Sequence, residues 1–372
     1  MKQEIREVPL SGPYLSDREE ELVLEVLRSR YLSFGPMVDR FEELVAERVG
    51  APYAAAVSSG TAGLHLLAIT AGIGAGDEVI TSPYSFAASA NCFVYEGGVP
   101  VFADIDPRTL NLTPAAVEAA ITSRTKAIVA VDIYGYPCEL DELRAIADRH
   151  GLAFIQDSCE AIGAEYKGRP IGSHGAPCVF AFYPNKQITT GEGGIVTTHS
   201  EEEWRLLRSL RNQGRGDSGG WLEHVRVGFN YRISDVTAAI GVGQVERLDE
   251  ILERRAAVAS RYHELLRGLD AVELPCADDA DHVRSWFVYV VLLPDNETRE
   301  RAIAAFEREG IGYNRYLPSI HLQPYMRERY GFREGMCPVS EDVSSRSMAL
   351  PFFTALDGPS QERVAEVLAS VL

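Results

Sequence analysis

Between residues 54 and 212, short apolar runs alternate with longer segments whose apolar residues recur at helical spacing. Short, nearly continuous apolar runs predict buried strands at residues 54–57, 78–81, 99–103, 127–131, 153–156, 178–182 and 195–198. Apolar residues at helical spacing between these runs predict helices at residues 60–73, 85–95, 113–121, 139–150 and 201–212. Strands that alternate with helices in this way favour a mostly parallel sheet covered on both faces.

The flanking segments predict further helices and a second, smaller unit. One helix starts at Ser16-Asp17, a second ends at Gly50, and Ser234 can cap a long helix whose apolar positions continue to Leu252. After it the pattern predicts a strand at 285–293, a helix at 297–309, an irregular aromatic segment at 313–325 and a final helix near 360–372. We therefore expect a large α/β domain over residues 1–250 and a small α+β domain over 251–372. The glycine-rich residues 216–220 are expected to form a surface loop.

Composition and charge exclude several classes of partner. The formal net charge is −18 at pH 7, which argues against nucleic acid or an acidic membrane surface, although a local cluster of amides and arginines can still hold a small anion. The six cysteines and eight histidines show no metal-ligand spacing, so we expect reduced thiols in a cytoplasmic protein without a metal site. The charged N-terminus lacks the pattern of a signal peptide, and no apolar run of about 18 residues predicts a transmembrane helix.

The most informative chemical feature is Lys186, which follows the apolar run at 178–182 and precedes a glycine-rich turn. A lysine at the end of a buried strand can lose its proton and act as an amine nucleophile toward an aldehyde. Asp157 closes the preceding strand in the same way. This pair suggests the Schiff-base lysine and the carboxylate facing a pyridinium nitrogen that pyridoxal phosphate enzymes require. Taken alone, however, such a lysine is more often a solvated loop residue.

Two turns add support for a cofactor site, whereas a third pattern only resembles a nucleotide-binding motif. At residues 57–65 a strand enters a small-residue turn that opens a helix, which leaves backbone N–H groups for a phosphate or simply forms a helix cap. In the turn at 82–88, Tyr84 or Phe86 could lie flat on a cofactor ring or pack in the core. Residues 72–77 mimic part of a dinucleotide fingerprint, but they precede a strand, which indicates a helix-to-strand turn.

In this order, the motifs resemble those of the DegT/DnrJ group of pyridoxal phosphate-dependent sugar aminotransferases, and the resemblance covers nearly the whole chain. It implies the type I fold of aspartate aminotransferase. It also implies that Lys186 forms the Schiff base with the cofactor and that Asp157 pairs with the pyridine nitrogen. The other cofactor contacts it implies are Phe86 on the ring, Glu160 near the ring hydroxyl, and Gly60, Thr61 and Ala62 at the phosphate. Asn230, within residues 228–232, matches an asparagine that reaches the phosphate of the neighbouring subunit, which implies an obligate homodimer with shared active sites.

The sequence departs from the family pattern at two positions. Ala181 stands where members commonly have a serine that contacts the phosphate, so one hydrogen bond to an anion, worth ~1.5–3 kcal/mol, is missing or replaced by Ser59 or water. Glu160 stands where many members have glutamine, which changes the protonation pattern around the ring hydroxyl.

Lys186 also separates two reactions, because relatives that remove a hydroxyl from the sugar have histidine there. We therefore expect transamination of a nucleotide-diphosphate-linked 4-keto-6-deoxy sugar, with L-glutamate as donor and 2-oxoglutarate as product. The motifs at 185–194 and 228–232 look like the perosamine synthase branch. Candidate substrate contacts are Arg232, Tyr316 and His321, although His321 could equally be a packed histidine.

The alternatives are a 3-keto sugar aminotransferase, a keto-sugar dehydratase that uses the same cofactor, and a non-catalytic protein that binds cofactor or sugar. Neither the nucleotide nor the pathway is predicted.

Overall fold

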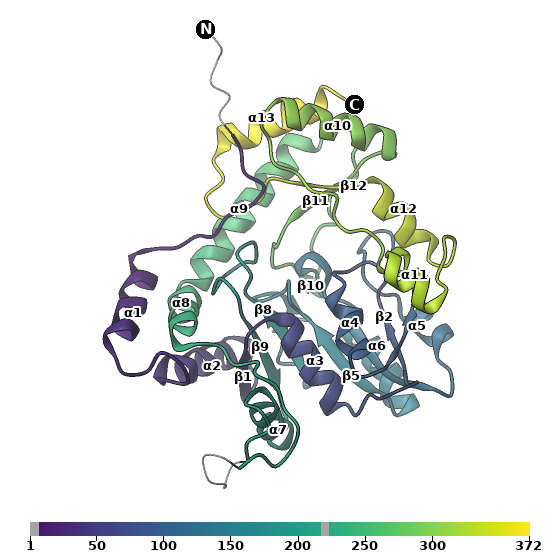
Figure 1. The fold of residues 1–372 in the computed structure, drawn as a ribbon. Coiled ribbons are helices and arrows are strands. Elements are labelled where there is room, and N and C mark those ends of the chain that lie inside the picture. Colours follow the sequence, from purple (N-terminus) through teal and green to yellow (C-terminus); the bar gives the residue numbers. More distant parts are fainter. Residues whose placement is uncertain (1–6, 217–222) are drawn as a thin grey trace.

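A seven-stranded sheet forms the centre of the molecule in the computed structural model, which describes residues 7–216 and 223–372 (Figure 1). The strand order is β1-β9-β8-β5-β4-β2-β3, and only β9 runs antiparallel to its neighbours. The bounds are β1 (Tyr53–Val57), β2 (Glu78–Thr81), β3 (Val99–Phe102), β4 (Thr125–Val131), β5 (Ala153–Asp157), β8 (Cys178–Ala181) and β9 (Gly194–Thr198). The expected mostly parallel sheet is confirmed.

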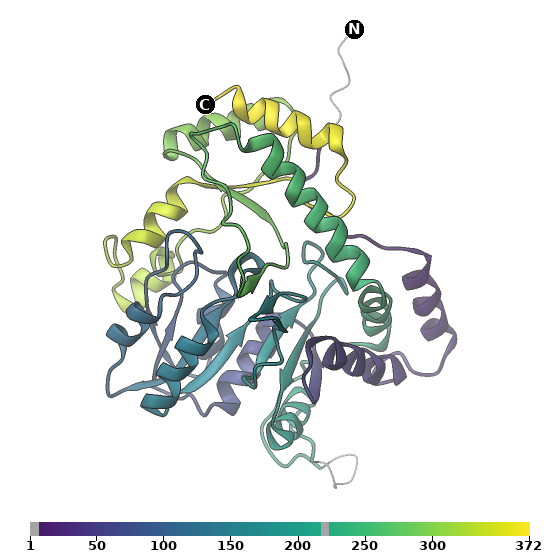
Figure 2. The ribbon, with the colours of Figure 1, turned by 180° about the vertical axis from the view of Figure 1, so that it is seen from behind.

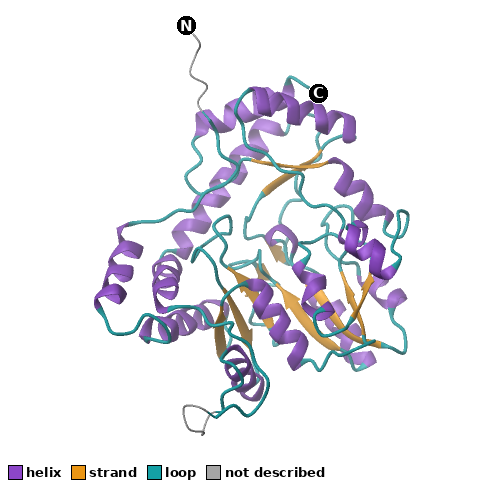
Figure 3. Cartoon of the chain, viewed as in Figure 1, coloured by secondary structure: helices purple, strands orange, loops and turns teal. Residues whose placement is uncertain are grey.

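Helices cover both faces of this sheet because its strands are apolar on both sides (Figure 3). In β1, for example, Ala54 and Ala56 face one helical layer while Ala55 and Val57 face the other. The first layer contains α2 (Pro36–Val49), α5 (Pro114–Ala120), α6 (Leu140–His150) and α8 (Asp235–Glu246), with α1 (Asp17–Arg28) packed on α8. The second contains α3 (Gly60–Thr70), α4 (Ala88–Val94) and α7 (Glu201–Arg211).

The long helix expected after Ser234 is two helices, α8 and α9 (Leu248–Leu266), separated by Arg247. Arg247 has φ −113 and ψ 11, and its guanidinium donates to Glu19 on α1 at 3.3 Å. The chain changes direction here because α8 packs against α1 and α2, whereas the later turns of α9 enter a different core. Figure 2 shows α9 rising from the large sheet to the smaller unit.

The smaller unit is built on a second core that α9, two strands and two helices share. Its elements are β11 (Tyr289–Leu292) paired antiparallel with β12 (Ser347–Leu350), α10 (Asn296–Arg308) and α13 (Gly358–Ala369). Val8, near the start of the described chain, joins this core. On α9, Leu248 and Ile251 belong to the core of the large sheet, and Val258 to that of the smaller unit. The domain division at residues 250 and 251 stays a prediction.

The remaining elements are short, and most of them were not predicted. They are a three-stranded sheet of β10 (His282–Val283), β6 (Glu165–Tyr166) and β7 (Arg169–Pro170), the helices α11 (Pro324–Tyr330) and α12 (Pro338–Arg346), and the 3-10 turns η1 (Ile133–Gly135) and η2 (Ile320–Leu322). Residues 217–220 of the expected surface loop lie outside the described residues. Within the described part of the chain, no helix is long and apolar enough to cross a membrane.

Candidate active site

The candidate residues gather at one edge of the large sheet. The turns after β1, β2, β5 and β8 all leave from the carboxyl ends of strands that run in the same direction, and β9, which runs the other way, begins at that edge. At this edge lie Gly60 at the start of α3, Phe86 and Lys186 in turns, and Asp157 at the end of β5. The carboxyl edge of an α/β sheet is where ligands bind in such folds.

Asp157 is the last residue of β5 and is only 5% exposed. Ser89 Oγ on α4 donates to its Oδ2 at 2.7 Å, and the N–H of Cys159 donates to its Oδ1 at 3.2 Å. Ser89 Oγ lies in turn 2.7 Å from Ser85 Oγ. The carboxylate is therefore held in one orientation by groups from two neighbouring turns.

Lys186 lies in a nearly closed environment. Its side chain is 13% exposed, and Nζ donates at 3.2 Å to Oε1 of Glu160, whose side chain is 9% exposed. Nζ also lies 3.9 Å from the ring centroid of Phe287, which the smaller unit contributes. The other oxygen of Glu160 accepts from the N–H of Tyr134 at 2.9 Å. The interpretation of Lys186 as a solvated loop lysine is therefore wrong.

Three tyrosines form a hydrogen-bonded layer beside this lysine. Tyr134 Oη donates to Tyr84 Oη at 2.9 Å, and Tyr84 Oη donates to the carbonyl oxygen of Tyr316 at 2.7 Å. Asn185, which precedes Lys186 in the chain, donates from Nδ2 to Tyr316 Oη at 3.3 Å. Burial raises the pKa of all three phenols, so they stay neutral at physiological pH. Tyr84 thus serves as a buried link in this layer, which leaves Phe86 as the aromatic available to a ring.

The N-terminus of α3 forms an open cradle. Ser59 caps the helix by accepting from the N–H of Ala62 at 3.1 Å, whereas the N–H groups of Gly60 and Thr61 have no hydrogen-bond partner among the described residues. A Cβ on Gly60 would lie 2.7 Å from Ala181 Cβ and 2.8 Å from Cys159 Sγ. The strand end and the helix start therefore approach each other only because residue 60 is glycine. Free N–H groups at the positive end of a helix favour an anion.

Phe86 and Asn230 present exposed side chains. Phe86 is 65% exposed, although it belongs to a turn whose neighbours are mostly buried. Asn230 is exposed, and the next residue, Tyr231, accepts at its carbonyl oxygen from the N–H of Ser58 at 2.8 Å. The segment that carries Asn230 therefore runs beside the cradle.

Two predicted substrate residues make no contact with Lys186, Asp157 or Glu160. Arg232 Nη1 donates to Asn212 Oδ1 at 3.2 Å, and its guanidinium lies 5.8 Å from the ring of Phe34. The ring of His321 is fully buried, with Nε2 3.0 Å from Glu341 Oε1 and Phe102 alongside. Of the two roles left open for His321, these contacts favour packing.

Ser89, Tyr134 and Phe287 contact Asp157, Glu160 and Lys186, respectively, but the sequence did not lead us to predict them. Tyr134 carried a usable signal, because it follows β4 at the same sheet edge as the residues that were identified. Ser89 lies on α4 and Phe287 in the smaller unit, and no local pattern points from either to Asp157 or Lys186.

The whole arrangement fits a flat cofactor that carries a phosphate, a ring nitrogen and an aldehyde. The open N–H groups of Gly60 and Thr61 suit the phosphate, the oriented carboxylate of Asp157 suits a protonated ring nitrogen, and Phe86 offers an exposed ring face. Lys186 supplies the amine. No group of three or more metal-ligating side chains occurs within residues 7–216 and 223–372.

Comparisons with known proteins agree with this chemistry. The model of the DegT/DnrJ/EryC1/StrS aminotransferase family matches residues 13–369. The spore coat polysaccharide biosynthesis protein SpsC of Bacillus subtilis is 36% identical over 378 residues, which cover 98% of this chain and 97% of SpsC. The crystal structure of S. venezuelae DesV superimposes with a TM-score of 0.90 and 32% identity, covering 97% of this chain and 98% of DesV. Helicobacter pylori PseC, an aminotransferase involved in pseudoaminic acid biosynthesis, superimposes with a TM-score of 0.91 and 27% identity, covering 98% of this chain and 99% of PseC.

Proposed function

Because this chain belongs to the DegT/DnrJ/EryC1/StrS aminotransferase family and is a pyridoxal phosphate-dependent sugar aminotransferase, we propose that it aminates a nucleotide-diphosphate-linked 4-keto-6-deoxy sugar with L-glutamate as donor. The observation that carries this proposal is the nearly buried amine of Lys186, held by Glu160 at the sheet edge that also carries the oriented carboxylate of Asp157. When bound, the cofactor supplies an aldehyde that accepts amino groups and a ring that withdraws electrons.

Each residue of the site has a distinct proposed role. With the cofactor bound, Lys186 Nζ would hold it through its aldehyde and would move a proton to and from the Cα of the amino acid. Asp157 keeps the proton on the ring nitrogen, which maintains the ring's demand for electrons. Gly60, Thr61 and Ala62 hold the phosphate at the start of α3, Phe86 lies against the ring, and Glu160 orients Lys186 and faces the ring hydroxyl.

The balance of atoms is that of a transamination. In the first half, glutamate gives up its amino group and leaves as 2-oxoglutarate, whose keto oxygen comes from a water molecule. In the second half, the keto carbon of the sugar receives the amino group and its oxygen leaves as water, so that no water is consumed overall. Lys186 Nζ carries the proton in both halves, in opposite directions. A histidine cannot form the same bond to the cofactor, so the lysine supports amination rather than loss of a hydroxyl.

We propose that two copies of the chain share their active sites. Asn230 supports this, because its exposed side chain has no hydrogen-bond partner within the described residues and is therefore available to a second copy of the chain. In the dimer Asn230 would reach the phosphate at the partner's site. We also place the reaction in the cytoplasm, where the six free cysteines stay reduced.

For the sugar itself we propose Tyr316 and Arg232 as contacts. Tyr316 reaches Asn185 beside Lys186, and its neutral phenol can donate to a sugar oxygen. Arg232 lies on the same segment as Asn230 and would face the partner's site with it. His321 is assigned a packing role through Glu341. The product would be an amino sugar for a glycan or a natural product.

The test is a substrate panel. The protein loaded with pyridoxal phosphate is incubated with L-glutamate and with nucleotide-linked 3-keto and 4-keto sugars, and products are identified by mass and NMR. The proposal expects an amine at C4 and one 2-oxoglutarate released for each amino sugar formed. Amination at C3 alone, or a deoxygenated product without nitrogen, would overturn it.

A further inference from the structure

His65 on α3 is a buried histidine whose two ring nitrogens both have a partner. The residue is 4% exposed, and its Nε2 lies 2.7 Å from Oε1 of Glu96, which follows α4. Its Nδ1 lies 3.0 Å from the hydroxyl oxygen of Tyr231. Because a carboxylate only accepts, Nε2 carries the proton, and in the neutral ring Nδ1 accepts from the tyrosine hydroxyl. These two hydrogen bonds hold the imidazole in one orientation on the helix whose first turn forms the cradle.

Aromatic rings surround this histidine. The ring centroids of Tyr95 and Phe229 lie 5.2 and 5.0 Å from that of His65, both in edge-to-face geometry. Phe229 and Tyr231 stack on each other at 4.9 Å, with 13° between their planes. These two rings, from residues two apart in the chain, therefore lie on the same face of residues 228–232, the face that meets α3.

The backbone of residues 228–232 is paired with the end of α7. The N–H of Tyr231 donates to the carbonyl oxygen of Arg211 at 3.0 Å, and Asn230 forms an antiparallel bridge with Asn212. In a segment paired in this way, successive side chains point to opposite faces. The side chain of Asn230 therefore points to the face away from α3.

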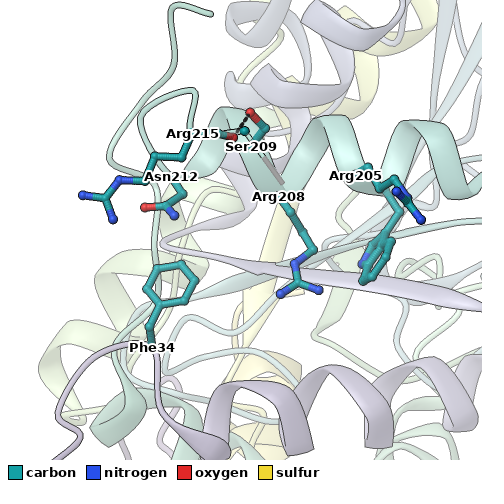
Figure 4. A pocket seen from close by; sticks show the side chains of 8 residues that line it. Phe34, Arg205, Arg208, Ser209, Asn212 and Arg215 are labelled. Atoms are coloured by element: carbon teal, nitrogen blue, oxygen red, sulfur yellow. Dashed lines mark hydrogen bonds between the residues drawn. The ribbon is translucent and has the colours of Figure 1, made fainter. Parts of the chain in front are cut away.

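The opposite face carries Arg232 beside Asn230, and it borders an open cavity. Arg232 donates to Asn212 Oδ1 at 3.2 Å, and Asn212 and Phe34 both line a cavity of about 300 Å³ (Figure 4). Figure 4 shows the side chain of Asn212 beside the ring of Phe34. The side chain of Asn230 has no hydrogen-bond partner within the described residues. Its direction therefore depends on how firmly the adjacent Tyr231 is held.

We propose that His65 is a positioning residue for the cofactor site of the partner subunit. Its hydrogen bond holds Tyr231 against α3, and this hold turns Asn230 towards the second copy of the chain. The inference rests on the proposed function, because it assumes that Asn230 reaches the phosphate at the partner's site. The contacts of His65 include neither Lys186 nor Asp157, so the site of its own subunit should not depend on it.

The experiment measures the affinity of cofactor-free dimers for pyridoxal phosphate from the visible absorbance of the lysine-bound cofactor. His65→Gln keeps a polar atom for Glu96 but loses Nδ1, so binding should weaken about tenfold, because a hydrogen bond to an anion is disturbed. Asn230→Ala should weaken binding at least as much. His65→Asn keeps a polar atom at the place of Nδ1 and should bind more tightly than His65→Gln.

His263→Gln is the matched control. His263 on α9 also lies 3.0 Å from a tyrosine hydroxyl, that of Tyr289 in the smaller unit. The same substitution there should leave the cofactor affinity unchanged. Tyr231→Phe is a second variant, which keeps the stacked ring, removes only the hydroxyl, and should weaken binding as His65→Gln does.

Hybrid dimers show in which subunit His65 acts. Lys186→Ala marks one subunit, which cannot hold the cofactor through lysine, so the absorbance reports only the site of the other subunit. With His65→Gln in the marked subunit, whose Asn230 faces the reported site, the affinity should fall by the same factor as in the homodimer. With His65→Gln in the unmarked subunit, the affinity should equal that of the hybrid with His65 intact.

The inference is overturned if the loss appears with His65→Gln in the unmarked subunit, or if His65→Gln binds as tightly as His263→Gln. It is also overturned if Tyr231→Phe binds as tightly as wild type. Equal affinity of Asn230→Ala and wild type would instead refute the shared sites of the proposed function, and the inference with them.

Discussion

Ala181→Ser should strengthen cofactor binding. Ala181 lies so close to the start of α3 that a Cβ on Gly60 would come within 2.7 Å of its own Cβ. A serine hydroxyl at this position would therefore lie beside the free N–H groups of Gly60 and Thr61, where we place the phosphate. One added hydrogen bond to an anion contributes ~1.5–3 kcal/mol. Since 1.4 kcal/mol is a factor of ten, the dissociation constant of pyridoxal phosphate should fall about 10- to 100-fold.

The assay is a titration of pyridoxal phosphate into cofactor-free protein, followed by the visible absorbance of the lysine-bound cofactor. Ala181→Cys is the control, because cysteine also adds one heavy atom to Cβ but is a weak donor. We expect the serine variant to bind well above both wild type and the cysteine variant. Equal affinity of the serine and cysteine variants would refute the placement of the phosphate beside Ala181.

Three further predictions test other parts of the account. Hybrid dimers of a Lys186→Ala subunit and an Asn230→Ala subunit contain one site with both residues intact, so turnover should recover to about half of wild type; turnover no better than that of the parent variants would refute shared sites. Gly60→Ala should lower the free energy of unfolding by ~1–3 kcal/mol in denaturant titrations through overpacking against Ala181. Gly268→Ala, whose Cβ meets nothing within 4 Å, is its control, and equal effects of the two would refute the tight approach. Asp279 tests acid stability: burial alone would raise the pKa of its carboxyl, but hydrogen bonds from the His282 ring and the N–H groups of Asp281 and His282 outweigh it and lower the pKa to about 2. The stabilisation from the Asp279 carboxylate is present above the unfolded pKa of ~3.9 and is lost as the pH falls towards 2. In Asp279→Asn, the free energy of unfolding should therefore depend less steeply on pH in that window. An unchanged pH dependence would contradict this.

The large sheet was predictable because its strands are buried on both faces and read as short continuous apolar runs. The predicted strands at 54–57 and 195–198, for example, lie within β1 and β9. The break at Arg247 was not predictable, since apolar residues continue on both sides of it and α8 packs against α1 and α2, which are distant in the sequence. The strand β12 was missed because four residues carry little periodicity, and its partner β11 lies more than 50 residues earlier in the chain.

The position of the candidate site residues was predictable where they lie at the end of a strand. Asp157, Gly60 and Lys186 each follow a recognisable strand, and the parallel order brings strand ends together. Phe287 could not be inferred this way, because only the packing of the smaller unit brings its ring to the lysine. The pairing of His321 with Glu341 could not be inferred either, because Glu341 lies on α12, 20 residues further along the chain.

The central claim is that Lys186 holds the cofactor and moves the proton when L-glutamate gives up its amino group, and a single turnover with L-glutamate tests it most directly. The loaded wild-type enzyme should lose the visible absorbance of its lysine-bound cofactor and release one 2-oxoglutarate for each bound cofactor. Lys186→Ala, reconstituted with the same cofactor, should lack that absorbance and give no catalytic turnover. Release of no 2-oxoglutarate by the wild-type enzyme, or full turnover by Lys186→Ala, would contradict the account.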